Sequence, residues 1–266
     1  MGAFQGSFYS NALGQNTRVG IIFPEESTDV TLERPGSPAV LYLLHGLGGN
    51  SEEWIRFSKL EYYAKKFNLI VILPEVGRSF YCDYPAGAKY FTYVADELPQ
   101  ICETWLRLPH QRERTFLAGE SMGGYGAVKI ALRRPERFGA VASLSGALDY
   151  SALARRVMSG AWPDMRPGEF SALHGPDGLP GAEDDVLELV RRRARDPGRP
   201  RMIQLCGTED FLYEDNQTFR RTAEAAGYGH TYREGPGEHA WPYWDKTIQQ
   251  AIWFFLELEE GSFPLF

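Results

Sequence analysis

Short apolar runs recur along the chain and predict buried strands. Their length and their lack of alternation are typical of strands covered on both faces, as in parallel sheets. Between them, apolar residues recur at steps of three and four residues, which is typical of amphipathic helices. The strand-like runs are Val40–Leu44, Leu69–Leu73, Phe116–Ala118, Val141–Leu144 and Met202–Cys206, and the helical spacing covers residues 94–108 and 248–255. Because strand and helix alternate, the pattern predicts a doubly wound α/β fold with a mostly parallel sheet.

Two segments depart from this rhythm. Residues before about position 38 alternate polar and apolar side chains, and we predict N-terminal antiparallel strands there, at the leading edge of the sheet. Residues from about 150 to 200 are rich in Gly, Pro and charge and lie between two core strands. We expect them to form a small cap over the carboxyl ends of the strands, where ligands bind in such sheets. The chain, residues 1–266, is interpreted as a single domain with this insertion.

Composition and charge indicate which kinds of molecule the protein binds and where it is located. Hydrophobic residues make up 43% of the chain and charged residues 24%, which is enough for a sizeable core. The formal net charge of −7 argues against nucleic acid, because that affinity depends on Lys and Arg neutralising phosphates. No apolar run approaches the roughly 18 residues of a membrane span. The first residues lack the basic and apolar regions of a signal peptide, so we predict a cytoplasmic protein unless a leader has been removed.

The cysteines and the basic run are predicted to have structural roles and not catalytic or metal-binding ones. Cys82, Cys102 and Cys206 match no metal-binding spacing and are predicted to be reduced, mostly buried thiols. The basic run Arg191–Arg195 follows an apolar stretch and precedes Asp196-Pro197-Gly198. We interpret the run as the solvated end of a helix, with an anion site as the alternative.

The strongest chemical signal is G-E-S-M-G-G-Y-G at residues 119–126. It follows a strand-like run and precedes a helical one, which is the setting that the G-x-S-x-G pattern requires. Small residues at positions 119 and 123 permit a sharp turn that lifts the Ser121 hydroxyl above the sheet, at the positive end of the next helix. We interpret Ser121 as a nucleophile, and a purely structural turn is the alternative.

A serine hydroxyl needs a base to take its proton, and the order Ser, Asp, His is typical of this pattern. His239 lies in G-P-G-E-H-A-W, a loop after the last predicted strand, and is our candidate base. Asp210, in the G-T-E-D-F-L loop after residues 202–206, is the candidate for orienting it. Glu209 and Asp215 are rivals, and Asp210 as a simple helix cap stays open. The other histidines away from such loops are interpreted as surface or packing residues: His110, His174 and His230.

The tetrahedral intermediate of acyl transfer needs amide donors aimed at its oxyanion. One normally comes from the residue after the nucleophile, here Met122. The second should come from H-G-L-G-G-N, residues 45–50, directly after an early strand, and Leu47 is the candidate. His45 is interpreted as shaping this loop. The loop lacks the glycine patterns of phosphate-binding motifs.

Aromatic residues are candidates for the walls of a pocket. Aromatic planes suit acyl chains, phenolic acids and sugars alike, so Trp54, Trp162 and Trp241 are predicted to bind substrate, with core or cap packing as the alternative. The remaining tryptophans fall in helical patterns and are interpreted as structural: Trp105, Trp244 and Trp253.

Taken together, these motifs resemble the esterase D-like branch of the α/β-hydrolases, specifically the tributyrin-esterase type of carboxylesterase. The resemblance spans nearly the whole chain and is carried by L-Y-L-L-H-G-L-G-G-N with Trp54, Y-V-A-D-E-L-P, G-E-S-M-G-G-Y-G, G-T-E-D-F-L-Y and G-E-H-A-W-P-Y-W-D. It implies that Ser121, Asp210 and His239 form a catalytic triad. Relatives of this type include cinnamoyl, feruloyl and acetyl esterases, S-formylglutathione hydrolases and mycolyltransferases.

The resemblance and the residues together predict a serine carboxylesterase. We expect it to hydrolyse small-molecule esters with short acyl, aryl or carbohydrate-linked groups through an acyl-enzyme, without metal or organic cofactor. The alternatives are an acyltransferase or S-formylglutathione-type thioesterase on the same residues, a peptidase, and a non-catalytic binding module. Tail residues Phe263 and Phe266 leave open a homo-oligomer or docking on the chain's own core.

Overall fold

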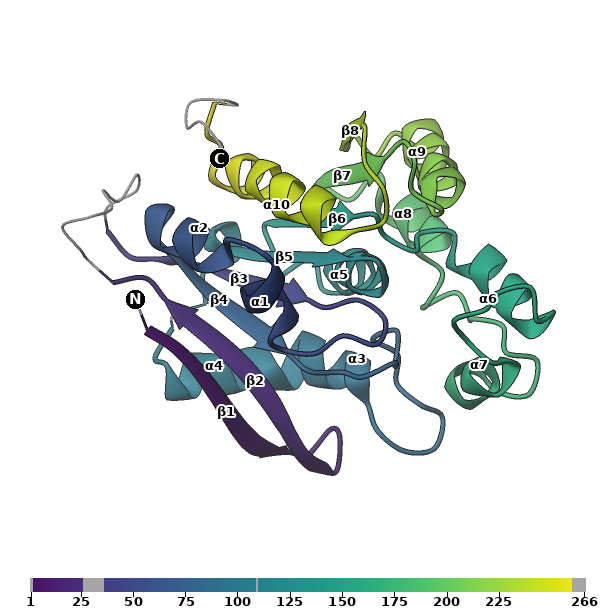
Figure 1. Cartoon of the computed structure of the whole chain (residues 1–266), viewed down its shortest axis with the longest axis horizontal. Helices are drawn as coiled ribbons and strands as arrows, with labels where there is room; N and C mark the ends of the chain where they lie inside the picture. The colour runs from purple at the N-terminus through teal and green to yellow at the C-terminus, as the bar shows by residue number, and fades with distance from the viewer. Residues whose placement is uncertain (1, 26–35, 109, 260–266) are drawn as a thin grey trace.

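The computed structural model describes residues 2–25, 36–108 and 110–259. In these residues one sheet has the strand order β1-β2-β4-β3-β5-β6-β7-β8 (Figure 1). The first two strands pair antiparallel with each other and β2 pairs antiparallel with β4, whereas all later pairs are parallel. The strands are β1 Gly2–Ser10, β2 Gln15–Phe23, β3 Ala39–Leu44, β4 Leu69–Pro74, β5 Thr115–Glu120, β6 Ala140–Leu144, β7 Arg201–Gly207 and β8 Thr231–Gly235. The predicted α/β fold, its buried strands and its N-terminal antiparallel hairpin are therefore confirmed.

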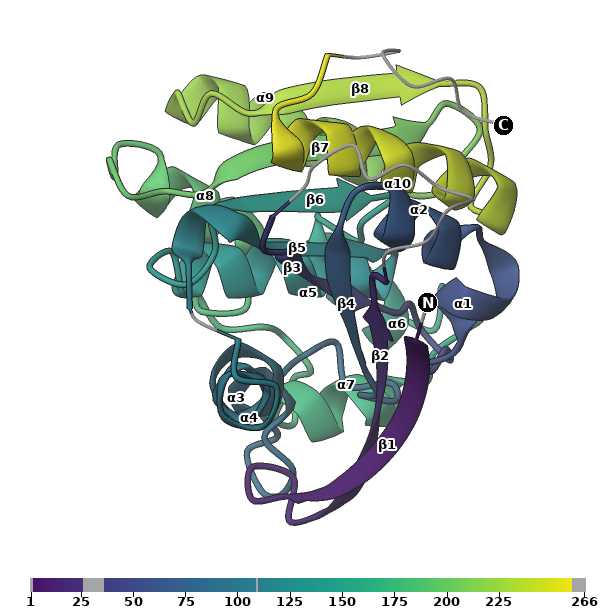
Figure 2. The ribbon, with the colours of Figure 1, turned by 90° about the vertical axis from the view of Figure 1, so that its left-hand side faces the viewer.

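Helices cover both faces of the sheet. Alternate residues of a strand point to opposite faces, so Tyr42 and Leu44 of β3 join one core while Leu41 and Leu43 join the other. One core is closed by α2 and α10 and the other by α4, α5 and α9, and the two sets lie on opposite sides of the sheet in Figures 1 and 2. The helices are α1 Glu53–Phe57, α2 Leu60–Lys66, α3 Tyr90–Thr92, α4 Leu98–Trp105, α5 Met122–Arg133, α6 Tyr150–Met158, α7 Pro167–His174, α8 Val186–Arg193, α9 Tyr213–Ala226 and α10 Trp241–Leu256.

The predicted helix over residues 94–108 is less regular than its spacing suggests. It begins with α3, continues through a π-helical stretch, Tyr93–Glu97, and ends with α4. Trp105, at its end, is 63% exposed and contacts Phe8 edge-on. Trp105 therefore packs against the chain through its contact with Phe8, and most of its side chain is exposed.

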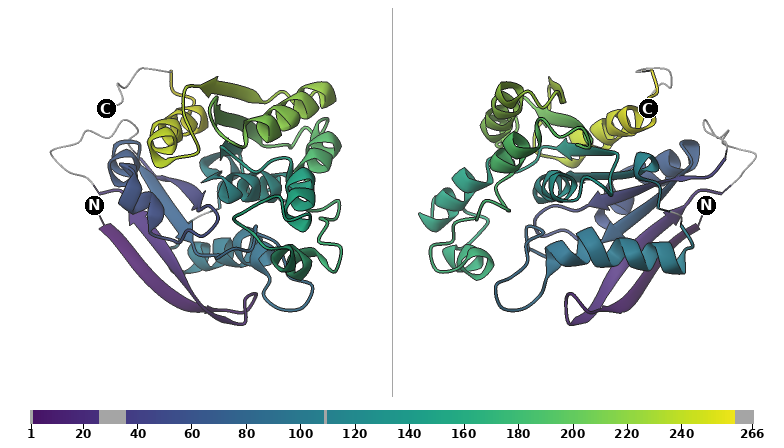
Figure 3. Two further views of the ribbon diagram at one scale, coloured as in Figure 1. Left: turned by 45° about the vertical axis from the view of Figure 1, so that its right-hand side comes forward. Right: turned by 180° about the vertical axis from the view of Figure 1, so that it is seen from behind.

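The segment between β6 and β7 contains the helices α6, α7 and α8 and no strand. In Figure 3, α6 and α7 stand away from the sheet, beyond the end of α5. Helix α8 begins at a cap, because the Asp185 side chain accepts hydrogen bonds from the amides of Leu187 and Glu188, and it ends in Arg191–Arg193. The basic run is thus a helix end, as predicted.

The remaining structural predictions concern cysteines, membranes and the tail. Cys82, Cys102 and Cys206 are free and buried. In the part of the chain that the structure describes, no helix has the length and apolar character to cross a membrane. Phe263 and Phe266 lie outside the described residues.

Candidate active site

Ser121 sits on a sharp turn between β5 and α5. Its backbone has φ 57° and ψ −119°, a conformation that a non-glycine residue adopts only under constraint. The turn is tight enough to require glycines on both sides: a Cβ on Gly119 would lie 2.5 Å from the carbonyl of Gly123, and one on Gly123 would lie 2.7 Å from the carbonyl carbon of Leu44. The strand, the turn and the helix therefore fix the position of the Ser121 hydroxyl.

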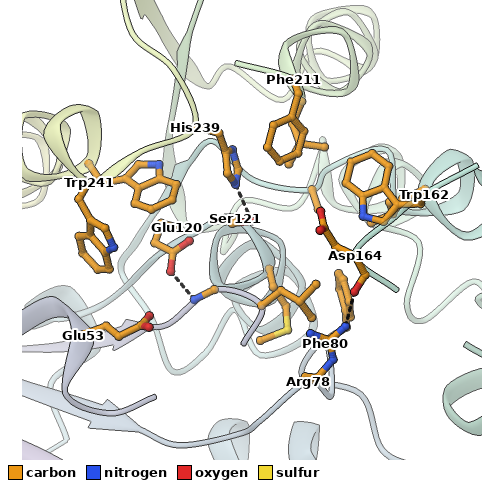
Figure 4. Close-up of a pocket in the computed structure, with 17 residues that line it drawn as sticks. Glu53, Arg78, Phe80, Glu120, Ser121, Trp162, Asp164, Phe211, His239 and Trp241 are labelled. Carbon is orange, nitrogen blue, oxygen red and sulfur yellow. Dashed lines mark hydrogen bonds between the residues drawn. The ribbon is translucent and has the colours of Figure 1, made fainter. Parts of the chain in front are cut away.

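A hydrogen-bonded chain links Ser121 to two side chains from distant loops. His239 Nε2 lies 2.9 Å from Ser121 Oγ (Figure 4). Its Nδ1 lies 2.9 and 3.0 Å from the two carboxylate oxygens of Asp210. The Asp210 side chain is fully buried and that of His239 is 12% exposed. Asp210 also accepts a hydrogen bond from the amide of Leu212, which orients the carboxylate. The structure thus brings together the serine, the base and the acid that were predicted separately.

The two rival carboxylates lie elsewhere. Glu209 accepts a hydrogen bond from the amide of Gly237, 2.6 Å away, on an exposed loop. Asp215 is paired with the guanidinium of Arg156. Neither has a hydrogen bond to His239 among the described residues, so Asp210 is the one of the three candidate carboxylates that is bonded to the imidazole.

The loop after β3 lies against the same turn. Leu47 and Met122 both line the cavity in front of Ser121, and in the described residues neither backbone amide donates a hydrogen bond to another group. His45 is buried within the loop. Its Nδ1 lies 2.8 Å from the carbonyl oxygen of Gly46, and its Nε2 accepts a hydrogen bond from the amide of Val76. Burial lowers the pKa of His45, which keeps the imidazole neutral and supports the prediction that it shapes the loop.

The cavity has a volume of about 450 Å³ and opens above Ser121. Figure 4 shows Trp241 and Glu53 on one side of the serine and Trp162, Phe211 and Asp164 on the other. Three lining residues come from the predicted insertion at about residues 150–200: Leu153, Trp162 and Asp164. The predicted tryptophans Trp162 and Trp241 therefore reach the cavity from opposite sides.

Trp54 does not reach the cavity, contrary to the prediction that it binds substrate. Its side chain is 1% exposed, its Nε1 donates a 3.2 Å hydrogen bond to the carbonyl of Leu44, and its ring contacts Trp241 edge-on. Trp54 is therefore a packing residue: its ring is buried from α1, where it bonds the end of β3 and contacts the indole of Trp241.

Three aromatic residues that sequence reasoning missed line the cavity: Phe80, Phe211 and Trp244. Trp244, interpreted as structural, packs edge-on against His239 with ring centroids 5.0 Å apart. Phe211 follows Asp210 directly, lies 4.2 Å from the His239 ring and is 60% exposed. For Phe211, adjacency to the acid was an available signal. For Trp244, the helical spacing of α10 gave no way to distinguish a core residue from one at the cavity edge.

Two carboxyl groups lie beside the loop after β3. Burial raises the pKa of Glu120 well above its ordinary value, the amide of Gly46 opposes this, and the nearby Glu53 adds to the rise. Burial likewise raises the pKa of Glu53, while Arg56 acts in the opposite direction. Both residues line the cavity, and the raised pKa of each favours the neutral, protonated carboxyl group.

A second polar cluster lies below the inserted helices, away from Ser121. Ligand-type atoms of Cys82, His174 and Asp184 lie within 4.8 Å of one another. The fully buried ammonium of Lys129 lies 2.9 Å from Cys82 Sγ and 3.1 Å from an Asp184 oxygen. Because a cation of the chain itself already occupies the space between these groups, the cluster is a structural ion pair that fastens the insertion to α5.

Comparisons with known proteins identify relatives along almost the whole chain. The model of the Esterase family matches residues 10–255. An acetyl esterase of Caldicellulosiruptor saccharolyticus is 30% identical over 263 residues, which cover 95% of this chain and 97% of that protein.

Two solved structures from Staphylococcus aureus are also similar along almost the whole chain. FphF, a fluorophosphonate-binding serine hydrolase solved with substrate bound, has a TM-score of 0.83 at 29% identity, covering 96% of this chain and 98% of its own. The S-formylglutathione hydrolase FrmB, solved as the apoenzyme, has a TM-score of 0.81 at 28% identity, with the same coverage. The chain therefore belongs to the Esterase family and is a carboxylic ester hydrolase with the α/β-hydrolase fold.

Proposed function

We propose that Ser121, His239 and Asp210 are the catalytic triad of this esterase. The observation that carries the proposal is the hydrogen-bonded chain from Asp210 through His239 to Ser121, which lines the cavity. The distances from Asp210 Oδ2 to His239 Nδ1 and from His239 Nε2 to Ser121 Oγ are both 2.9 Å. In this arrangement Asp210 holds the imidazole with Nδ1 protonated, which leaves Nε2 free to accept the serine proton.

The reaction proceeds in two acyl transfers. His239 takes the proton of Ser121 as the hydroxyl attacks the ester carbonyl, and the amides of Leu47 and Met122 hold the resulting oxyanion. The imidazolium then protonates the alcohol oxygen, the carbon–oxygen bond breaks and the acyl-enzyme remains. Water enters, gives its proton to His239 and releases the acid by the same steps in reverse order. These residues carry out every proton transfer that the reaction needs.

The proposed substrates are esters of short acyl groups with small alcohols. A cavity of about 450 Å³ accommodates a small ligand, and the similar protein from Caldicellulosiruptor saccharolyticus is an acetyl esterase. We further propose that the segment at about residues 150–200 acts as the cap, since it supplies part of the cavity lining. Three free, buried cysteines fit the proposed cytoplasmic location.

A thioester of glutathione is the second candidate substrate, because FrmB is an S-formylglutathione hydrolase. We rank oxygen esters first, because the matching family model describes esterases and the relative that is 30% identical to this chain is an acetyl esterase. Rates with S-formylglutathione, measured beside p-nitrophenyl acetate, separate the two.

The deciding experiment compares the wild type with Ser121→Ala. Initial rates on p-nitrophenyl esters from acetate to octanoate, with methyl ferulate alongside, should be highest for the shortest acyl group. Loss of the nucleophile should lower kcat by about 10⁶-fold, the scale found when a triad serine is removed. Undiminished turnover in a folded Ser121→Ala protein would refute the proposed role of this residue.

A further inference from the structure

Glu120, the residue immediately before Ser121, connects the two loops of the site. It ends β5, is 2% exposed, and its carboxylate accepts a hydrogen bond from the amide of Gly46 (Figure 4). The contact is close: a Cβ on Gly46 would lie 2.7 Å from the Glu120 carboxyl carbon. One side chain thus joins the turn that carries the serine to the loop that carries Leu47.

The neighbouring backbone groups of this loop have other fixed partners. The hydroxyl of Tyr81 donates a 2.8 Å hydrogen bond to the carbonyl of His45. The carbonyl of Gly46 lies 2.8 Å from His45 Nδ1 and also accepts from the amide of Gly49. In a trans peptide the C=O and the following N–H point in opposite directions, so a Gly46 carbonyl held toward His45 directs the Leu47 amide away from it.

Gly46 has no side chain to limit its backbone rotation. The peptide on its N-terminal side is held at both ends, by Glu120 at the Gly46 amide and by Tyr81 at the His45 carbonyl, and Glu120 is the one of the two that comes from the turn carrying Ser121. We propose that Glu120 is a positioning residue for the reaction: it holds Gly46 so that the Leu47 amide points at the oxyanion. This inference rests on the proposed function, because it needs Ser121 as the nucleophile.

Burying a carboxyl group here is costly, which argues for a role beyond stability. Glu120 has its hydrogen bond from Gly46 but no cationic partner among the ion pairs of the described residues. An apolar side chain would fill the same space without that desolvation cost. The carboxyl oxygen supplies what an apolar group lacks, an acceptor for the Gly46 amide.

The test compares Glu120→Gln with Glu120→Leu by steady-state kinetics on p-nitrophenyl acetate. The glutamine keeps an acceptor oxygen at the same distance along the side chain, and the leucine removes it at similar volume. We expect kcat of Glu120→Leu to fall by about 10- to 100-fold with KM within about two-fold, since a misdirected oxyanion donor costs on that scale. Glu120→Gln should stay within about five-fold of the wild type.

Controls separate positioning from folding. Glu113→Leu removes an exposed glutamate in the turn before β5 and should leave kcat and KM unchanged. Thermal unfolding identifies any variant that does not fold. If Glu120→Leu does not fold, Glu120→Met replaces it in the same comparison, because the flexible methionine side chain fits irregular space.

The outcomes distinguish this inference from the proposed function. Full kcat in Glu120→Leu, an equal loss in the glutamine and leucine variants, or a change confined to KM would overturn the positioning role while Ser121→Ala stays inactive. An active Ser121→Ala would overturn the proposed function and this inference with it. The inference is supported if kcat falls in Glu120→Leu or Glu120→Met but stays near the wild-type value in Glu120→Gln.

Discussion

Two walls of the same cavity are built in different ways. One, which we name the catalytic wall after the proposed triad, consists of Gly46, Leu47, Ser121, Met122 and His239. The other, the insertion wall, consists of Leu153, Trp162 and Asp164. On the catalytic wall the reacting groups are fixed by a strained turn, close backbone contacts and the fully buried carboxylate of Asp210.

The insertion wall is held to the rest of the rim by more exposed contacts. Arg78 bonds Glu169 at 2.9 Å, and their side chains are 41% and 33% exposed. Trp162 packs edge-on against Phe211, which is itself 60% exposed. The difference indicates that main-chain geometry holds the proposed reacting groups, whereas partly exposed side chains line the part of the cavity that we propose selects the ester.

The largest effect should come from the catalytic wall. Asp210→Asn keeps the shape of the side chain but can stabilise the wrong tautomer of His239 and gives the imidazolium no counter-charge. We expect kcat on p-nitrophenyl acetate to fall by about 10⁴-fold, as for the equivalent change in a Ser-His-Asp triad. The rival carboxylate supplies the control: Glu209→Gln should remain near wild-type activity. A comparable loss of kcat in both variants would show that activity depends on the conformation of this loop and not on the Asp210 carboxylate itself.

The catalytic wall is also the region that the sequence predicts well. Ser121, its flanking glycines and the loop at 45–50 are local patterns whose backbone requirements are visible in the residue types. Asp210 and His239 follow from the order of strands, because the carboxyl ends of parallel strands share one edge of a sheet. Only the choice among neighbouring carboxylates needed the structure, since a shift of one residue in a loop redirects a side chain.

The walls around it were less predictable because they depend on side-chain direction. Trp54 turns inward and Trp244 reaches the cavity, although charged residues lie within two positions of both in the sequence and do not distinguish them. Glu120 occupies the variable position of G-x-S-x-G, which carries no signal of its own. The contact between Lys129 and Asp184 joins positions far apart in the chain, and no local pattern encodes it.

A second, smaller effect should appear on the insertion side as pH falls. His174, at the end of α7, lies 2.8 Å from the Tyr150 hydroxyl, and burial lowers its pKa to about 4 from an ordinary 6.5. As pH falls below about 6.5 the unfolded chain binds the proton first, so the stability present above that pH is lost progressively down to about pH 4. This group alone should cost at most about 3 kcal/mol of unfolding free energy.

Urea unfolding at pH 7 and at pH 4.5 measures this loss. His174→Gln keeps a polar group near Tyr150 but does not titrate, so its stability should fall less than that of the wild type over the same interval. Contributions from His45 and His230, whose pKa values burial also lowers, are common to both proteins and cancel in the difference. An identical pH dependence in the two proteins would show that His174 is not the group responsible.

The smallest effect, and the sharpest test of the comparison, concerns Trp162. Removing its ring by Trp162→Ala takes apolar surface from the insertion wall and the edge-on contact from Phe211, without touching the hydrogen bonds of Ser121. We expect kcat/KM for octanoate or ferulate esters to fall about five-fold, roughly 1 kcal/mol, with acetate nearly unchanged, because a short acyl group does not need that surface. Trp105→Ala, on a distant exposed helix end, is the matched control. An equal loss on acetate would mean that the two walls are coupled, since the insertion would then be holding the catalytic geometry as well as the substrate.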